Sequence, residues 1–237
     1  MNRCEKAFDL KDENALAFRI VKYSSLTYFV VGIIALALAM IAVPPTGLAY
    51  PYLDTLRQYP RDYFWQYVAI LMLIVYLVLY VSLASTVKDE RKAVSNIGLV
   101  FSAMSCLVLI ATYYIQVSVV PISLMSGEND GLALLTQYNP HGLFIALEEI
   151  GYILMLFSIA SLVWIFTGNS RAEKAIRIVS LIACIGSLLS YAVITMIFGL
   201  EKGDNFEIAI ILFVWIANIV NSILIFSVFG KSLRNQS

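Results

Sequence analysis

Long runs without a charged side chain alternate with short polar segments along the whole chain. Six such runs occupy positions 23–53, 63–87, 93–127, 150–170, 178–200 and 208–230. The hydrocarbon core of a bilayer is about 30 Å thick, and an α-helix of about 20 apolar residues crosses it. Each run meets that length. Lipid offers no hydrogen-bond partner to an open backbone, which favours helices. The pattern therefore predicts an all-α, polytopic integral membrane protein with six transmembrane helices.

The runs place the expected helices at approximately 24–44, 63–86, 94–120, 140–167, 175–199 and 206–230, within a single membrane domain. Proline marks several boundaries, because it cannot continue a helix without losing a hydrogen bond. Pro44 and Pro45 are expected to end the first helix, and Pro121 the third. The fourth helix is expected to begin with Asn139 as its N-cap and Pro140 at its first position.

Basic residues lie almost entirely on one side of this arrangement. Of the 16 Lys and Arg residues, 13 lie in the N-terminal segment 1–22, in the second and fourth connections and at the C-terminus. The other 3 are Arg57, Arg61 and Lys202, in the first and fifth connections. Short loops rich in Lys and Arg stay in the cytoplasm. We therefore expect both termini to be cytoplasmic, and the protein to be integral to the plasma membrane.

The strongest local signal for function is at the start of the fourth expected helix. His141, Glu148 and Tyr152 are spaced by seven and then four residues, which places them on one helix face. Glu149 lies about 80° to the side of that face. Both glutamates are about 12 Å below the expected helix start. A carboxylate inside a membrane is costly and indicates function, unless the helix begins deeper in water and the glutamates lie at headgroup level.

The third and sixth expected helices carry further polar side chains within their apolar runs. Tyr113 and Gln116 lie toward the end of the third, and Asn218 and Asn221 lie in the middle of the sixth. Such groups need partners inside the protein, because hydrocarbon offers none. They either join helices by hydrogen bonds or line a polar site together with Glu148.

Several kinds of chemistry are excluded or made improbable by the composition. His141 is the only histidine, and no His-Glu-x-x-His motif is present, so we expect no metal centre. There is no Gly-rich phosphate loop, and we expect no cofactor. The formal net charge is zero, which gives no basis for nucleic-acid binding. The cysteines, Cys4, Cys106 and Cys184, are not expected to form a structural disulfide.

Three hypotheses for function remain open. In the first, the protein binds or transports a small molecule or ion through a polar cavity lined by the third, fourth and sixth helices, with Glu148 and Glu149 binding a cation or proton. In the second, it is an accessory, structural or sensory membrane subunit whose polar residues pair among themselves. In the third, it is an intramembrane enzyme that acts on a lipid-like substrate with Glu148 and Glu149 as acid and base.

The expected partners are the lipid bilayer and either a second copy of the chain or another membrane protein. The general composition resembles that of small six-span prokaryotic membrane proteins, and this resemblance assigns no role to any residue.

Overall fold

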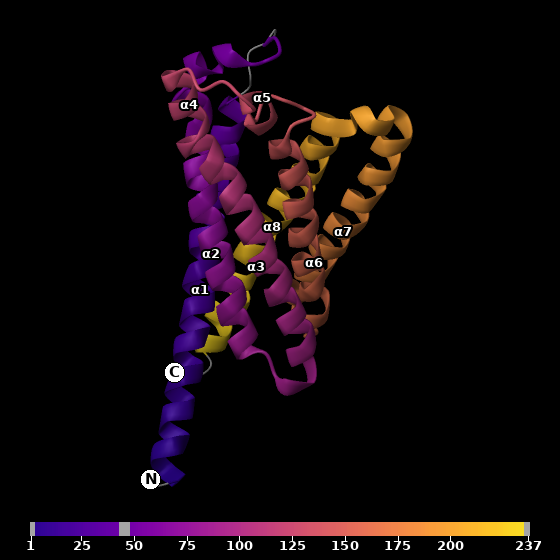
Figure 1. Ribbon diagram of the computed structural model, residues 1–237. Helices are drawn as coiled ribbons and strands as arrows, with labels where there is room; N and C mark the ends of the chain where they lie inside the picture. The colour runs from indigo at the N-terminus through magenta and orange to yellow at the C-terminus, as the bar shows by residue number, and fades with distance from the viewer. Residues whose placement is uncertain (1–2, 43–47, 235–237) are drawn as a thin grey trace.

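The computed structural model describes residues 3–42 and 48–234, and the side chains of residues 3–14 and 202–204 lie outside that description. The structure is 87% helix, and no strand occurs in its described part. This confirms the all-helical prediction. Figure 1 shows an elongated bundle of long helices with a group of short helices at one end.

Six long helices form the body of the bundle. They are α1 (Arg3–Ile41), α2 (Phe64–Thr86), α3 (Asp89–Ser118), α6 (Leu143–Ile165), α7 (Arg171–Phe198) and α8 (Gly203–Arg234). Each contains a stretch long and apolar enough to span a membrane, with mean hydropathy between 1.9 and 2.6. The six predicted spans therefore correspond to six helices.

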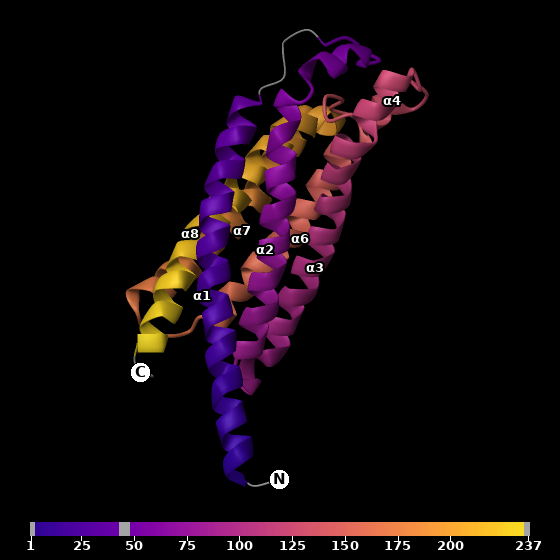
Figure 2. The ribbon, with the colours of Figure 1, turned by 90° about the vertical axis from the view of Figure 1, so that its left-hand side faces the viewer.

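Short helices connect the long ones at the end of the bundle opposite the termini. They are η1 (Leu53–Gln58), η2 (Arg61–Tyr63), α4 (Val120–Ser126), α5 (Leu132–Leu135) and η3 (Gly199–Lys202). The described segments 48–63 and 119–142 are called the cap below. Both termini lie at the other end, and the first turns of α1 extend beyond the remaining helices (Figures 1 and 2).

The helices differ in how much of their surface the bundle covers. The most extensive contacts join α3 to α6, α1 to α2 and α8, α7 to α8, and α2 to α3. In the most apolar stretch of α6, 56% of the residues are buried, against 11% in α7. α6 is therefore the helix best enclosed by protein, and α7 lies on the outside (Figure 1).

α3 and α6 approach closely because glycine faces the neighbouring helix at two levels. A Cβ atom on Gly151 would lie 2.5 Å from the Leu109 side chain, and one on Gly98 would collide with Ser161. The Ser105 hydroxyl also donates a hydrogen bond to the Gly151 carbonyl, at 2.8 Å. Small residues at a contact let two membrane-type helices come together in this way. The pairing of α3 with α6 sets the position of the site described below.

One predicted boundary differs from the structure, and another is not tested by it. Pro121 lies in the first turn of α4, directly after α3, so the chain remains helical on both sides of Val119. Proline is tolerated in a first turn, where its missing N–H would have no partner. α1 ends at Ile41, and the predicted stop at Pro44 and Pro45 lies outside the described residues.

The start of α6 also differs from the prediction. The helix begins at Leu143 with Gly142 as its N-cap, three residues later than expected. Asn139 instead shapes the preceding turn: its Oδ1 accepts the His141 N–H at 3.0 Å, and its Nδ2 donates to the Ala133 carbonyl at 2.6 Å. Asparagine often bonds the backbone two residues ahead, and here that turn competes successfully with a helix cap.

Candidate functional site

The best-buried polar group of the bundle is formed by four side chains from three helices. We call Tyr113, Glu148, Tyr152 and Trp215 the Glu148 cluster. Glu148 and Tyr152 are four residues apart on α6 and therefore share a face. Tyr113 comes from α3 and Trp215 from α8. All four side chains are at most 1% exposed.

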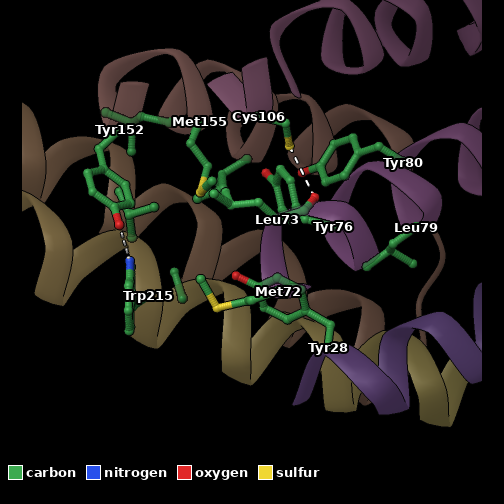
Figure 3. Packing of buried hydrophobic residues seen from close by; sticks show 14 of the residues in the cluster. Tyr28, Met72, Leu73, Tyr76, Leu79, Tyr80, Cys106, Tyr152, Met155 and Trp215 are labelled. Atoms are coloured by element: carbon green, nitrogen blue, oxygen red, sulfur yellow. Dashed lines mark hydrogen bonds between the residues drawn. The ribbon is translucent and has the colours of Figure 1, made fainter. Parts of the chain in front are cut away.

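The cluster is held together by a short chain of hydrogen bonds. The Tyr113 hydroxyl donates a hydrogen bond to Glu148 Oε1 at 2.5 Å. Its oxygen also lies 2.6 Å from the Tyr152 hydroxyl oxygen. The indole N–H of Trp215 donates to the Tyr152 hydroxyl at 2.8 Å (Figure 3). Hydrogen bonds to a carboxylate are stronger than those between neutral groups. The chain therefore orients Glu148 from two helices besides its own.

The second carboxylate oxygen of Glu148 has different surroundings. Oε2 makes no hydrogen bond of ordinary geometry with the described residues. The carboxyl of Glu207, at the start of α8, lies close enough to interact with the Glu148 carboxyl. Glu207 is half-buried, whereas Glu148 is enclosed. The interacting carboxyls of Glu148 and Glu207 therefore extend from the enclosed cluster to a more exposed position on α8.

Aromatic rings surround the hydroxyl groups of the cluster. The ring of Trp65, on α2, packs edge-on against Tyr113 at 5.1 Å and lies 6.4 Å from Trp215. Phe144 lies 6.1 Å from Tyr113 on the side nearer the cap. Such rings exclude water and lower the local dielectric, which strengthens each hydrogen bond between polar groups inside.

Two predicted site residues on the same segment lie apart from the cluster. His141 is exposed and precedes α6, so the prediction that it shares a helix face with Glu148 and Tyr152 is wrong. Its position follows from the late start of the helix. Glu148 is consequently about 8 Å from the first residue of α6, and not about 12 Å. Glu149 is half-buried and, as the next residue along α6, lies about 100° further around the helix than the fully buried Glu148.

Gln116 lies one turn from Tyr113 on α3, but its hydrogen bonds join α3 to the cap. Its Nε2 donates to the Leu135 carbonyl, and its Oε1 accepts the Gln137 N–H at 3.0 Å. The Gln137 side chain in turn accepts a hydrogen bond from Gln66 of α2 at 2.6 Å. These contacts close the bundle above the Glu148 cluster.

A buried carboxylate joins the two segments of the cap to each other. Asp62 is fully buried and accepts hydrogen bonds from Arg61, at 2.5 Å, and from the Tyr138 hydroxyl, at 3.4 Å. Burial raises the pKa of the Tyr138 phenol, and the neighbouring Tyr63 and Asp62 raise that pKa further. Tyr138 therefore remains a protonated donor to Asp62 at neutral pH.

Asn218 and Asn221 lie one and two turns beyond Trp215 on α8, toward the terminal end. The Asn218 amide donates to the Met155 sulfur at 3.3 Å, and the Asn221 amide donates to the Ser180 hydroxyl of α7 at 3.0 Å. Both are buried and both join helices. They belong to a second polar region and do not touch the Glu148 cluster directly.

An apolar layer separates the two polar regions. Met72, Leu73 and Met155, which we call the methionine layer, lie between the Tyr152–Trp215 pair and the tyrosines Tyr76 and Tyr80 (Figure 3). The order along α6 agrees, since Met155 lies three residues after Tyr152 and three before Ser158, which contacts the Tyr76 hydroxyl at 2.5 Å. All three layer residues are at most 1% exposed.

A small cavity of about 10 Å³ lies beyond this layer. We call it the Tyr28 cavity, and it is lined by Tyr28, Tyr76, Leu79, Tyr80, Leu162, Asn218, Asn221, Ser222 and Ile225. A larger surface depression of about 590 Å³ lies at the cap, where Asp130 and His141 meet a mostly apolar wall from α5 and the start of α6. Within the described residues, no group of three or more potential metal-binding side chains was found.

Several residues of these regions were not predicted from the sequence. Trp215 lies on the sixth expected helix beside Asn218 but carries no sequence signal of its own. Glu207 opens that helix on the face of Asn218 and Asn221 and was expected at the outer membrane boundary, not in the site. Tyr76 and Tyr80 are four residues apart in an otherwise apolar helix, a spacing that indicates a shared face. That spacing was the available signal for the Tyr28 cavity.

No protein-family model, curated protein or solved structure matches this chain.

Proposed function

We propose that this chain is a six-span membrane protein of the ion-transport class, and that it binds a proton at Glu148. The observation that carries the proposal is the fully buried Glu148 carboxyl, which is held by Tyr113 on one oxygen and approached by Glu207. An ionisable group enclosed within membrane helices, with no Lys or Arg in its hydrogen-bonded chain, is typical of proton and ion pathways.

The proposed orientation follows from the basic residues. The connections that carry Lys88, Arg91, Lys92, Arg171, Lys174 and Arg177 lie at the same end of the bundle as both termini (Figure 1). By the positive-inside rule this end faces the cytoplasm and the cap faces outward, in a plasma membrane. The exposed apolar face of α7 then contacts lipid, or a second membrane-embedded chain.

The geometry supplies the chemistry that proton binding needs. When Glu148 is ionised, the Tyr113 hydroxyl donates to Oε1 and the Trp215 indole holds Tyr152 in place. When Glu148 is protonated at Oε1, its own O–H can donate to the Tyr113 oxygen, and Tyr113 can turn its proton toward Tyr152, because the two tyrosine oxygens are 2.6 Å apart. Tyr113 thus keeps a donor or acceptor bond to Glu148 in both protonation states. The titratable groups that face Glu148 are Tyr113, Tyr152 and Glu207.

Proton flux into vesicles tests this proposal. The purified protein is reconstituted into liposomes that enclose a pH-sensitive dye, and an inward potassium-diffusion potential supplies the driving force. We expect Glu148→Gln to reduce the protein-dependent flux at least tenfold. Glu149→Gln is the matched control, because it removes the adjacent carboxyl outside the cluster, and it should retain the flux. Equal flux in the parent and in Glu148→Gln would contradict the proposal.

A second function is favoured by one observation. The polar side chains of α3, α6 and α8 pair directly with one another, as expected of an accessory or structural subunit. In that case Glu148→Gln lowers stability at every pH and no protein-dependent flux occurs. The enzyme hypothesis has less support, because Glu148 is enclosed in the cluster whereas Glu149 is half-buried and about 100° further around α6.

A further inference from the structure

Glu148 is enclosed, so a proton that binds there needs a route to the solution. Tyr113 and Tyr152 face its carboxyl and are themselves fully buried. The methionine layer covers the cluster on the side of the termini, and the hydrogen bonds of Gln116 close the bundle on the side of the cap. Glu207 interacts with the same carboxyl and, unlike the two tyrosines, is half-buried. The route therefore leads through Glu207.

Glu207 lies at nearly the same depth in the bundle as Glu148. It is about 6 Å along the axis from the first residue of α8, and Glu148 is about 8 Å from the first residue of α6. Both helices begin at the end of the bundle that carries the cap (Figure 1). The buried ring of Phe206, next to Glu207, packs against Tyr191 of α7 at 4.9 Å and so holds the start of α8 in place.

Two carboxyl groups in contact attract each other only when a proton lies between them. An ionised carboxylate has acceptor atoms and no donor, and two of them side by side repel each other. The contact of Glu148 with Glu207 is therefore favourable when one acid is protonated and donates its O–H to the other. Oε1 of Glu148 already accepts the Tyr113 hydroxyl, whereas Oε2 makes no hydrogen bond of ordinary geometry with the described residues. Oε2 thus has the capacity for this bond.

We infer that Glu148 and Glu207 form a carboxyl pair that shares one proton, and that Glu207 exchanges this proton with the solution at the cap end of the bundle. This role of Glu207 rests on the proposed function, because it serves the proton that binds at Glu148. In the transfer, the O–H bond of one acid breaks as that of the other forms, so the pair keeps one negative charge throughout. Glu207 then gains or loses its proton at its exposed side.

The shape of a pH titration tests whether the two acids act as a pair. Two interacting acids lose their protons in two coupled steps that belong to the pair. The other titratable groups near the pair are the phenols of Tyr113, Tyr152 and Tyr191, from α3, α6 and α7. We expect the infrared carbonyl band that Glu148→Gln removes to titrate in two steps in the parent and in one step in Glu207→Gln. A single step in the parent would overturn the inference, whatever the variants do.

Proton flux into liposomes tests the route. Glu207→Gln keeps the size and polarity of the side chain but removes its acid, so we expect flux to fall by about tenfold or more while the Glu148 band is retained. Glu207→Asp keeps an acid on a shorter side chain and should retain more flux than Glu207→Gln. Equal loss in both would show that the acid itself is not needed. Glu201→Gln, at an exposed acid just before α8, is the matched control and should retain the parent flux.

The variants also separate the role of Glu207 from the proposed function. If Glu148→Gln abolishes flux and Glu207→Gln does not, the proposed route is wrong and proton binding at Glu148 stands. If Glu207→Gln removes both the flux and the Glu148 band, Glu207 only holds the cluster in shape, which also overturns the inference. A parent protein without flux contradicts the proposed function instead, and the number of titration steps then decides whether the carboxyl pair exists.

Discussion

The Glu148 cluster and the Tyr28 cavity are two polar regions in one apolar bundle, separated by the methionine layer. In the Glu148 cluster the hydroxyls of Tyr113 and Tyr152 are bonded to each other, to a carboxyl and to an indole. In the Tyr28 cavity the hydroxyls of Tyr28 and Tyr80 make no hydrogen bond of ordinary geometry with the described residues. They lie close enough to neighbouring neutral side chains to interact with them, Tyr28 with Asn218 and Tyr80 with Tyr76. Both regions are equally buried.

The comparison shows that burial alone does not identify a functional group. What separates the two regions is the presence of an ionisable side chain. The Glu148 cluster contains a carboxyl that can gain or lose charge, so its hydrogen bonds have two alternative arrangements. The Tyr28 cavity is lined only by neutral groups. We therefore assign proton binding to the first region and a packing role to the second.

The largest effect on both regions is expected from enlarging Gly151, which lies between Glu148 and Tyr152 on α6. Gly151→Leu forces the side chain into Leu109 of α3 and separates the two helices. Overpacking of this size should cost more than about 3 kcal/mol of unfolding free energy. Size-exclusion chromatography should show loss of the monodisperse protein. Ala146→Leu, at an exposed position of the same helix, should remain folded.

Truncating a side chain of the methionine layer should connect the two polar regions. Met155→Ala removes a fully buried side chain and should cost about 3 kcal/mol. If the layer keeps the regions apart, the variant should also raise proton leak in vesicles. Met155→Leu retains the volume, so it should cost less than about 1.5 kcal/mol and leave the leak unchanged. A leak no higher in the alanine variant than in the leucine variant would mean that the layer is not a barrier.

The Glu148 cluster can be loosened without removing its acid. Trp215→Phe deletes the donor to Tyr152 and leaves an aromatic ring in place. We expect a loss of about 2 kcal/mol, combining one hydrogen bond and a small cavity. Denaturant titration measures this loss. Trp164→Phe, at a position that is 66% exposed, should change stability little. Similar losses in both variants would show that the Trp215 hydrogen bond contributes nothing.

The smallest effect is expected at the edge of the Tyr28 cavity. Ser180→Ala removes the acceptor that fixes the Asn221 amide and should cost about 1 kcal/mol. It should not affect proton flux, because Ser180 makes no contact with the Glu148 cluster. Ser85→Ala, which alters an exposed serine bonded only to its own helix, is the control. A strong effect of Ser180→Ala on flux would show that the two regions are coupled.

Much of the fold was predictable, because six apolar runs dominate the sequence. The boundaries were less predictable where local side-chain bonding competes with helix signals. Asn139 and Pro140 form a typical helix start, yet Asn139 completes the turn before α6. At the start of α7, Ser170 is the N-cap: its hydroxyl oxygen accepts the Glu173 N–H at 3.2 Å, and its O–H donates to the Glu173 carboxylate at 2.6 Å.

The candidate site was predictable only in part. Helical periodicity correctly places Glu148 and Tyr152 on one face and predicts a polar face on α3 that Tyr113 flanks. It puts Glu207 on the polar face of α8 but does not show that Glu207 and Trp215 meet Glu148 and Tyr152. Gln116 was grouped with the site because an amide in an apolar run needs a partner inside the protein, but its partners belong to the cap. Pairing between helices depends on bundle geometry, which periodicity within one helix does not contain.

The central claim is that Glu148 binds and releases a proton inside the bundle. The most direct measurement is a pH titration of the purified protein by difference infrared spectroscopy, which detects the carbonyl stretch of a protonated carboxylic acid. Because the chain has 16 Asp and Glu residues, the informative signal is the titrating band that Glu148→Gln removes from the parent spectrum. We expect that band to be retained in Glu149→Gln and shifted in midpoint in Glu207→Gln. A Glu148→Gln spectrum that lacks none of the parent's titrating bands would contradict the claim.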